Sequence, residues 1–504
     1  MKKLTLLLIS LLAASVAGLA SPRGLGAYLS HATFNVPGQG PYLETYLEIL
    51  GNTIRYKAID GGKFQGSVQV TMIIKQDSVI RDFRKYELLS PEVSDTTAVG
   101  INFIDQQRFM LPDGNYTIDL SIADINSPRK PHFVTYPVSI SFPADQLSVS
   151  GIQMISAYSK TITENVLSKS GYDFVPFVDN FYPSDKNKLT FYAEIYNPLH
   201  QEGSEEKYLV SAFIESFETK KILTDYVRVK KEPSRPVNVL VNEFDITQLP
   251  SGNYNLVVNV RNKSNEVIAQ NITFFQRSNP GVGSPAIDLA SVSVANTFAD
   301  RISNADTLRE YLRSMQPIAT EMESIFIRSQ LNTASLEMLK QFFLNFWRTR
   351  DETNPEATWE AYKFEVKKVN VAYKTQLRKG YETDMGRVYL RYGPPNSIVD
   401  RPFETTGYNL NAPVNGKPER GSVPYQIWHY YSINNNRERN RKFVFISSSL
   451  KTMDYMLVHS DAMGEIQNFN WQRMLSRDLD IEDYNADTMK KDRRTSSFDY
   501  NDGF

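Results

Sequence analysis

The sequence contains no cysteine among its 504 residues. This excludes disulfides, thiolate metal sites, thiol nucleophiles and the attachment of lipid to a cysteine. An excess of charge of one sign is also lacking, because 56 basic and 57 acidic side chains leave a net charge of -1. A balanced chain has no overall field that would draw it onto nucleic acid, so we expect no nucleic-acid partner.

Catalytic and cofactor-binding motifs are absent as well. The sequence has no Gly-x-Ser-x-Gly elbow, no phosphate-binding glycine loop and no His-Glu-x-x-His helix. Histidine is scarce and scattered, occurring only at His31, His132, His200, His429 and His459. Of these, His429 and His459 would meet only if their strands were neighbours. We therefore predict no cofactor, no metal site and no catalytic set.

The N-terminus has the pattern of an export signal. Lys2 and Lys3 precede a run of apolar or small residues over 4–17, and Gly18, Leu19 and Ala20 follow before Ser21. We assign residues 1–20 to a cleaved signal peptide, with a retained N-terminal anchor as the alternative. No later run approaches the roughly 18 apolar residues of a transmembrane helix, so we expect no membrane-spanning segment after cleavage.

An internal repeat organises the first half of the chain. The segment Leu111–Ile122 recurs as Leu249–Val260, 138 residues later, and both contain Leu-Pro-x-Gly-Asn-Tyr. Runs such as 43–49 and 68–72 alternate in side-chain character with the period of strands that bury one face. We predict two all-β, immunoglobulin-like sandwiches at 21–147 and 148–276. In each, Tyr116 or Tyr254 should donate a hydrogen bond back to nearby backbone, as in a tyrosine corner. The alternative is two unrelated sandwiches that share a common turn.

A third domain follows a linker rich in Ser, Asn, Pro and Gly at 277–293. Apolar residues spaced by three and four predict helices at 306–315, 335–348 and 355–378, and Asn354 is placed to cap the last. Strands are predicted at 387–392, 425–432, 442–447 and 455–459, with a short helix at 469–475. We expect an α+β domain at 294–476 and a polar, mobile tail at 477–504.

The third domain carries an ordered series of motifs. They are Phe346-Trp347-x-x-Arg350-Asp351, Gly380-Tyr-x-Thr-Asp384, Gly386-Arg387-Val-Tyr389, Tyr392-Gly-Pro-Pro395 and Trp428-x-Tyr-Tyr431. In this order they resemble the GWxTD domain, a family of exported proteins of Bacteroidetes-type bacteria in which the domain usually follows β-sandwiches. The resemblance covers residues 295–475, with Tyr381 in place of the tryptophan that names the family. It implies a periplasmic or outer-membrane-associated protein of a Gram-negative bacterium, and it brings no established reaction.

We take the following residues as candidates for interaction or for the family motif: Trp347, Arg350, Asp351, Tyr381, Thr383, Asp384, Arg387, Arg391, Tyr392 and Trp428. The motif around Tyr381 suggests a corner. Gly380 would end the long helix with a positive φ, Tyr381 would pack back on that helix, and Thr383 or Asp384 would bind backbone amides ahead of a strand. The charged candidates could then form a buried ion network or line a cleft.

Three functional hypotheses follow from the sequence. The first, which we favour, is a non-enzymatic cell-envelope protein whose third domain binds a partner protein or an outer-membrane complex. The second is a periplasmic hydrolase or glycan-processing enzyme that uses Asp351 or Asp384, and the third is a glycan-binding module. Two carboxylates facing one cleft would favour the enzyme, whereas carboxylates engaged by arginine and backbone groups would disfavour it.

Overall fold

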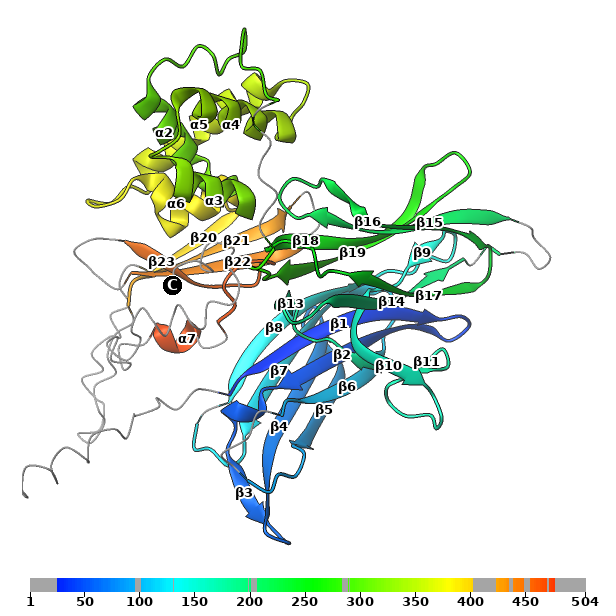
Figure 1. Ribbon diagram of the computed structural model, residues 1–504. Helices are drawn as coiled ribbons and strands as arrows, with labels where there is room; N and C mark the ends of the chain where they lie inside the picture. The colour runs from blue at the N-terminus through cyan, green and yellow to red at the C-terminus, as the bar shows by residue number, and fades with distance from the viewer. Residues whose placement is uncertain are drawn as a thin grey trace, which may run out of the picture. The chain divides into compact units, whose positions relative to one another are not determined.

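The chain forms two compact units, Met1–His31 with Pro41–Ile140 and Ala32–Gly40 with Ser141–Phe504. The computed structural model describes residues 25–95, 101–129, 131–197, 199–200, 206–282, 289, 291–401, 423–434, 438–447, 454–468 and 471–475. The architecture is mostly β, with several sheets whose strands are antiparallel except for the parallel pair β13 and β19 (Figure 1). The predicted signal peptide and polar tail lie outside the described residues.

Residues 27–140 form two sheets, and apart from residues 32–40, which include the end of the first strand and the start of the second, these residues belong to the first unit. One has the strand order β1-β2-β6, and the other has the order β3-β4-β7-β8 with β5 also paired to β4. The strands are β1 (Ala27–Val36), β2 (Gly40–Ile49), β3 (Tyr56–Ile59), β4 (Lys63–Gln76), β5 (Val79–Leu89), β6 (Phe103–Met110), β7 (Gly114–Asp124) and β8 (His132–Ile140).

Strand burial in this unit follows the sequence pattern in one strand and departs from it in another. In β4, Val68, Val70 and Met72 are fully buried and alternate with more exposed residues, as predicted. In β2 the prediction of one buried face is wrong, because Glu44 and Tyr46 on the other face are buried too. The Tyr46 hydroxyl donates to Glu44 at 2.6 Å, so the second face is stabilised by polar contacts.

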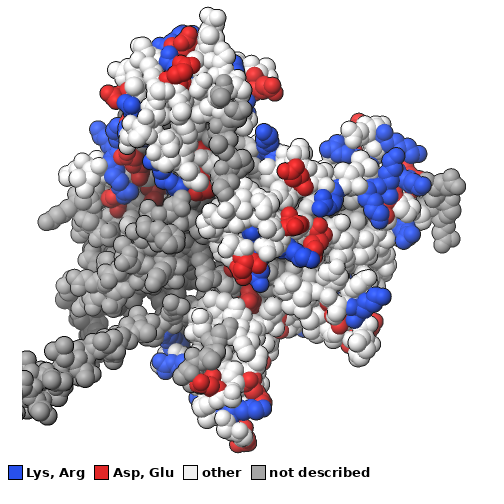
Figure 2. All heavy atoms as spheres, in the orientation of Figure 1, with Lys and Arg blue, Asp and Glu red and all other residues white. Residues whose placement is uncertain are grey.

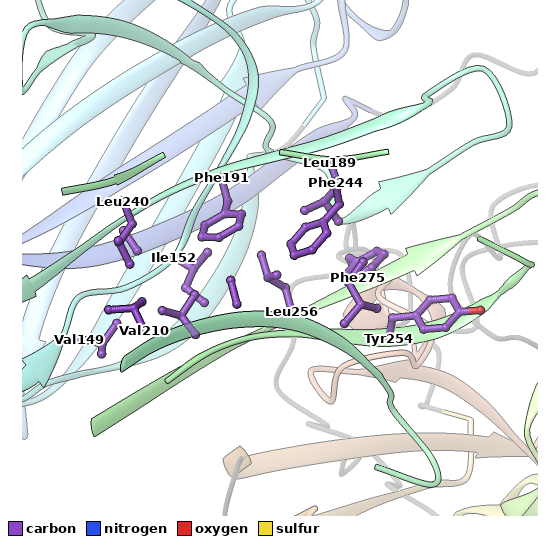
Figure 3. Packing of buried hydrophobic residues seen from close by; sticks show 14 of the residues in the cluster. Val149, Ile152, Leu189, Phe191, Val210, Leu240, Phe244, Tyr254, Leu256 and Phe275 are labelled. Carbon is purple, nitrogen blue, oxygen red and sulfur yellow. The ribbon is translucent and has the colours of Figure 1, made fainter. Parts of the chain in front are cut away.

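The second unit begins with another pair of sheets. Their orders are β11-β12-β10-β14-β17, with β9 on β14, and β13-β19-β18-β15-β16. The strands are β9 (Ser148–Val149), β10 (Gln153–Lys160), β11 (Ser168–Lys169), β12 (Tyr172–Pro176), β13 (Phe181–Tyr182), β14 (Lys188–Tyr196), β15 (Lys207–Ser216), β16 (Ile222–Pro233), β17 (Val237–Asp245), β18 (Gly252–Arg261) and β19 (Val267–Arg277). Figure 3 shows the core between these sheets, where Phe191 and Phe244 face Leu256.

The internal repeat is visible in hydrogen bonds and in topology. Tyr116 donates to the carbonyl of Pro112 at 2.8 Å, and Tyr254 donates to that of Pro250 at 3.0 Å. Both predicted tyrosine corners are therefore confirmed. The order β5-β4-β7-β8 of the first unit corresponds strand by strand to β16-β15-β18-β19 of the second, and the pair β2-β6 corresponds to β14-β17.

Helices and a four-stranded sheet follow the second sandwich. The helices are α2 (Ala305–Ser314), α3 (Glu321–Gln330), α4 (Leu336–Arg350), α5 (Pro355–Ala372) and α6 (Asp384–Tyr392), with the 3-10 turns η2 (Gln316–Ile318) and η3 (Gly380–Glu382). The sheet, in the order β20-β21-β22-β23, is formed by β20 (Ser397–Arg401), β21 (Tyr425–Ile433), β22 (Glu438–Ser447) and β23 (Tyr455–Ser460), and α7 (Trp471–Met474) follows it. One apolar core lies among α2 to α5, and another lies between α6 and the sheet.

Most of these elements match the sequence predictions, and four do not. The helix predicted to extend to residue 378 ends at Ala372, although Asn354 caps it as expected by accepting from the Ala357 amide. The strand predicted at 387–392 is wrong, because these residues belong to helix α6. Helix α3 and strand β20 were not predicted. Among the described residues, no helix is long and apolar enough to cross a membrane.

Candidate functional site

The Gly-Tyr-x-Thr-Asp motif forms a tight corner between two helices. Thr383 caps α6, because its hydroxyl accepts from the Gly386 amide at 3.1 Å and donates to the carbonyl of Gly380 at 2.7 Å. Tyr381 is 5% exposed and packs against α5 with Val366 and Val369, as predicted. The motif is therefore a packing and capping device.

Glycine is required at this corner by close packing. Gly380 does not have the predicted positive φ. A Cβ on Gly380 would lie 2.1 Å from the carbonyl oxygen of Val369, and a Cβ on Gly386 would lie 1.8 Å from that of Gly380. Real side chains do not approach backbone this closely, so α5, η3 and α6 can meet only if both positions lack a side chain.

Helix α6 also carries a buried ion pair. Arg387 donates two hydrogen bonds to Glu465, at 2.8 and 2.7 Å, and the Tyr392 hydroxyl donates a third at 2.9 Å. Burial alone would lower the pKa of Arg387, but the charge and hydrogen bonds of Glu465 outweigh it and the pKa is raised. Burial would likewise raise the pKa of Glu465, yet Arg387 holds it below the ordinary value of 4.5. Both shifts favour the charged pair, which joins α6 to the loop after β23.

The two candidate carboxylates are engaged at separate structural positions. Asp384 accepts from the amide of Leu457 in β23 at 2.8 Å, which ties the start of α6 to the sheet. Asp351 ends α4 and accepts from the amides of Thr353 and Asn354 at 3.0 and 2.9 Å. These amide bonds, led by that from Asn354, lower the pKa of Asp351. Among the described residues, Asp351 and Asp384 are not joined by a hydrogen bond.

Arg350 forms an ion pair with a different glutamate. Its guanidinium donates to both carboxylate oxygens of Glu323, at 2.9 and 2.8 Å, and to the carbonyls of Phe346 and Ile318. The central carbon of the guanidinium, Cζ, lies 3.3 Å from the ring centroid of Phe346. The contacts fix the end of α4 against the start of α3.

Arg391 differs from the other candidates because it faces the second sandwich. Its Nη2 atom lies 3.6 Å from a carboxylate oxygen of Glu218, which follows β15, and it has no hydrogen-bond partner within the described part of the chain. Burial raises the pKa of Glu218, since Arg391 is too distant to offset it. The pKa of Arg391 is raised despite burial, with Tyr392 and Glu465 ahead of Glu218 among the causes. Arg391 and Glu218 therefore form a loose ion pair between helix α6 and the second sandwich.

The tryptophan candidates are core residues. Trp428 is fully buried, packs against Tyr373 and Phe445, and donates from its ring to Gln426 at 3.0 Å. Trp347 is 1% exposed and contacts Trp359 at a centroid distance of 5.4 Å. Among the described residues, no hydrogen-bond acceptor is seen for its ring nitrogen. Their aromatic faces are occupied by neighbouring side chains, so neither presents an exposed ring to a ligand.

The two C-terminal histidines do not meet. β22 lies between their strands, with His429 opposite Lys442 and His459 opposite Val444. Burial, followed by the charge of Lys442, lowers the pKa of His459 to about 4. Its Nδ1 accepts from the amide of Asn468 at 3.1 Å. Within the described ranges, no group of three or more metal-binding side chains was found.

Three carboxylates that complete these contacts were not among the candidate residues. Glu465, Glu323 and Glu218 bind Arg387, Arg350 and Arg391, and each is distant from its partner in the chain. Only Glu323 had a local signal, because Thr320-x-x-Glu323 is a capping box that marks the start of α3.

Comparisons with known proteins give no family for the chain. No protein-family model matches it, and no curated protein matches it. Among solved structures, a β-glucuronidase of Bacteroides uniformis is similar at 8% identity and a TM-score of 0.17, over 46% of this chain and 26% of that one. A glycosyl hydrolase family 2 member from Bacteroides cellulosilyticus has 10% identity and a TM-score of 0.17, over 46% and 26%. Fibronectin(III)-like modules of Clostridium thermocellum have 8% identity and a TM-score of 0.15, over 48% and 89%.

This chain spans about a quarter of the length of the two hydrolases. At such TM-scores the similarities carry no inference about its function.

Proposed function

We propose that this chain is a non-enzymatic cell-envelope protein whose C-terminal part, a GWxTD-like α+β domain, binds a partner protein or an outer-membrane complex. The two sandwiches act as a spacer that presents this domain. In this proposal the chain is exported through its N-terminal signal and resides in the periplasm or at the outer membrane of a Gram-negative bacterium.

One observation carries the proposal: four of the charged candidates, Arg350, Asp351, Asp384 and Arg387, are engaged in contacts that hold elements of the fold together. Arg350 and Arg387 each form a two-bond pair with a glutamate, and Asp384 binds a backbone amide of the sheet. Asp351 is likewise engaged by amides at a helix end. A general acid and base need carboxylates with separated pKa values around room for a substrate, whereas these carboxylates stabilise corners. The motif is therefore suited to keep a surface rigid.

Affinity purification of the full chain from detergent-solubilised envelopes tests the proposal. Wild type should recover a defined partner, and Gly386→Val should lose it, because the substitution disrupts the corner between α5 and α6. Val229→Ser, an exposed position on the second sandwich, is the matched control and should recover the partner as wild type does. Recovery of the chain alone in every condition would overturn the proposal. So would turnover of an envelope glycan that Asp351→Asn or Asp384→Asn abolishes.

A further inference from the structure

Helix α5 has an outward stripe that packing within the chain does not explain. At 100° per residue, Phe364, Lys367, Lys368 and Val371 fall within an arc of about 100°, opposite the buried stripe of the helix. Phe364 is 59% exposed and Val371 is 80% exposed, and Leu377, in the turn after the helix, is 87% exposed. The Phe364 ring keeps one contact on the helix, with the Lys368 ammonium 4.5 Å from its centroid. Apolar side chains this exposed gain little from the fold of the chain itself.

The same stretch is strongly basic, although the whole chain is nearly neutral. Residues 363–379 contain six basic side chains and one acidic side chain, Glu365. Lys363, Lys368 and Lys379 are paired with glutamates, and Arg378 with Asp454. Among the described residues, no ion pair is seen for Lys367 or Lys374. Two lysines therefore lack intramolecular neutralisation beside three exposed apolar side chains.

A second basic group of the same unit has a simpler explanation. Figure 2 shows Lys and Arg gathered at the end of the second sandwich formed by β15 and β16, where Arg228, Lys230 and Lys231 are exposed. β16 is the last strand of its sheet. Lysines on an edge strand protect it against pairing with another strand. The edge group needs no partner, and it provides a control for the α5 stripe.

The chemistry of the α5 stripe fits one class of partner. Its cations are all lysines, which are depleted in protein–protein interfaces, and its apolar residues are separated by charges and form no continuous patch. A basic amphipathic helix with exposed apolar side chains is typical of binding at a membrane surface, where the apolar groups enter the headgroup region and lysines contact anionic headgroups. A planar, deformable surface also accommodates a convex helix without a groove.

We infer that the outer stripe of α5 and the following turn, formed by Phe364, Lys367, Val371, Lys374 and Leu377, bind peripherally to an anionic lipid bilayer. The inference adds a lipid contact to the envelope location of the proposed function and does not depend on the protein partner. It places the helical part of the chain against a membrane, with the buried corner around Tyr381 facing away from the lipid.

Co-sedimentation of the purified mature chain with vesicles tests the inference. Wild type should bind phosphatidylcholine vesicles that contain phosphatidylglycerol and should not bind phosphatidylcholine alone, and added salt should weaken the binding. Lys367→Gln with Lys374→Gln should lower the partition coefficient about twenty-fivefold, since each lysine near an anionic surface contributes about fivefold. Val371→Ser with Leu377→Ser should lower it about tenfold or more, because less apolar area enters the interface.

Val229→Ser with Lys231→Gln, on the edge strand β16, should bind as wild type does. All these side chains are exposed, so the variants should keep the wild-type unfolding transition. The inference would be overturned if the wild-type chain did not bind anionic vesicles, or if both stripe variants bound them as strongly as wild type does. It would also be overturned if the stripe variants lost a crosslinked acidic protein in cells while vesicle binding was unchanged. None of these results would alter the outcome of the envelope purification.

Discussion

Removal of the carboxylate of Glu465 should destabilise the C-terminal part of the chain strongly. The side chain of Glu465 is fully buried and that of Arg387 is 16% exposed, and Glu465 accepts hydrogen bonds from Arg387 and Tyr392. Glu465→Ala leaves a buried guanidinium without its counter-ion, a change that costs about 3–5 kcal/mol in comparable pairs. Replacing both partners, as in Arg387→Met with Glu465→Leu, removes the stranded guanidinium and should cost less than Glu465→Ala, although the Tyr392 hydroxyl loses its acceptor and Arg391 loses a nearby negative charge.

The distribution of tryptophan provides a local assay. All four tryptophans, Trp347, Trp359, Trp428 and Trp471, lie beyond the two sandwiches in the sequence. Tryptophan emission in a urea titration therefore reports unfolding of the C-terminal part, whereas a chain of several domains is not expected to unfold in one step. If Glu465→Ala costs less than about 1 kcal/mol, or the double variant is as unstable as the single one, the pair is not the structural contact described above.

The pair also determines how stability responds to acid. The pKa of Glu465 in the folded chain lies below its ordinary value of 4.5. The unfolded chain therefore binds the proton more readily, so the stabilisation is fully present above pH 4.5 and is lost as the pH falls through the folded pKa. Glu465→Gln should remove this part of the acid dependence.

Three further predictions concern single contacts. The pKa of His459 is about 4 against an ordinary 6.5, so stability should fall by about 3 kcal/mol as the pH drops from 6.5 to 4; His459→Gln should abolish this slope in tryptophan emission, and an unchanged slope would refute the assignment. Gly386→Ala should cost about 3 kcal/mol or more because of its contact with the Gly380 carbonyl, whereas Gly281→Ala, with open space around it, should have no effect on the same transition. Tyr254→Phe should cost about 1 kcal/mol through loss of its bond to Pro250; circular dichroism of the strand signal measures it, and a neutral result would contradict a stabilising tyrosine corner.

Local features of the sequence predicted local features of the structure. The Leu-Pro-x-Gly-Asn-Tyr repeat predicted both tyrosine corners because the donor and the acceptor are four residues apart. Asn354 and the spacing of Trp359, Val366 and Val369 predicted α5 because a cap and an apolar stripe are set within one helix. The end of α5 was missed, since Tyr373 to Lys379 contains no residue that excludes a helix.

The strand predicted at 387–392 shows where local pattern is ambiguous. Val388, Leu390 and Tyr392 alternate with Arg387, Tyr389 and Arg391, which is the period of a strand. Met385, Val388, Tyr389 and Tyr392 also have the spacing of a helical stripe, and this stripe packs on the core with the sheet. The segment therefore fits both periods. Tertiary packing and the Thr383 cap determine the helix, and neither is visible in a period of two.

The candidate site was predicted in its residues but not in its contacts. Arg387 and Glu465 are 78 residues apart, and Arg391 lies in α6 whereas Glu218 lies in the turn after β15. No spacing in a single sequence specifies such pairs, because they depend on how elements pack. The close approach of Gly380 and Gly386 was hidden for the same reason, although both glycines were part of the recognised motif.

The most direct test of a structural role for the motif is partner recovery by isosteric variants in the native host. Asp351→Asn and Asp384→Asn keep an oxygen that can accept the amides of Asn354 and Leu457. We predict that both variants retain the wild-type tryptophan transition and recover the same partner from solubilised envelopes in the same amount. A variant that keeps the wild-type tryptophan transition but no longer recovers the partner would contradict the account. It would show that the charge of the carboxylate itself is needed for the activity of the chain.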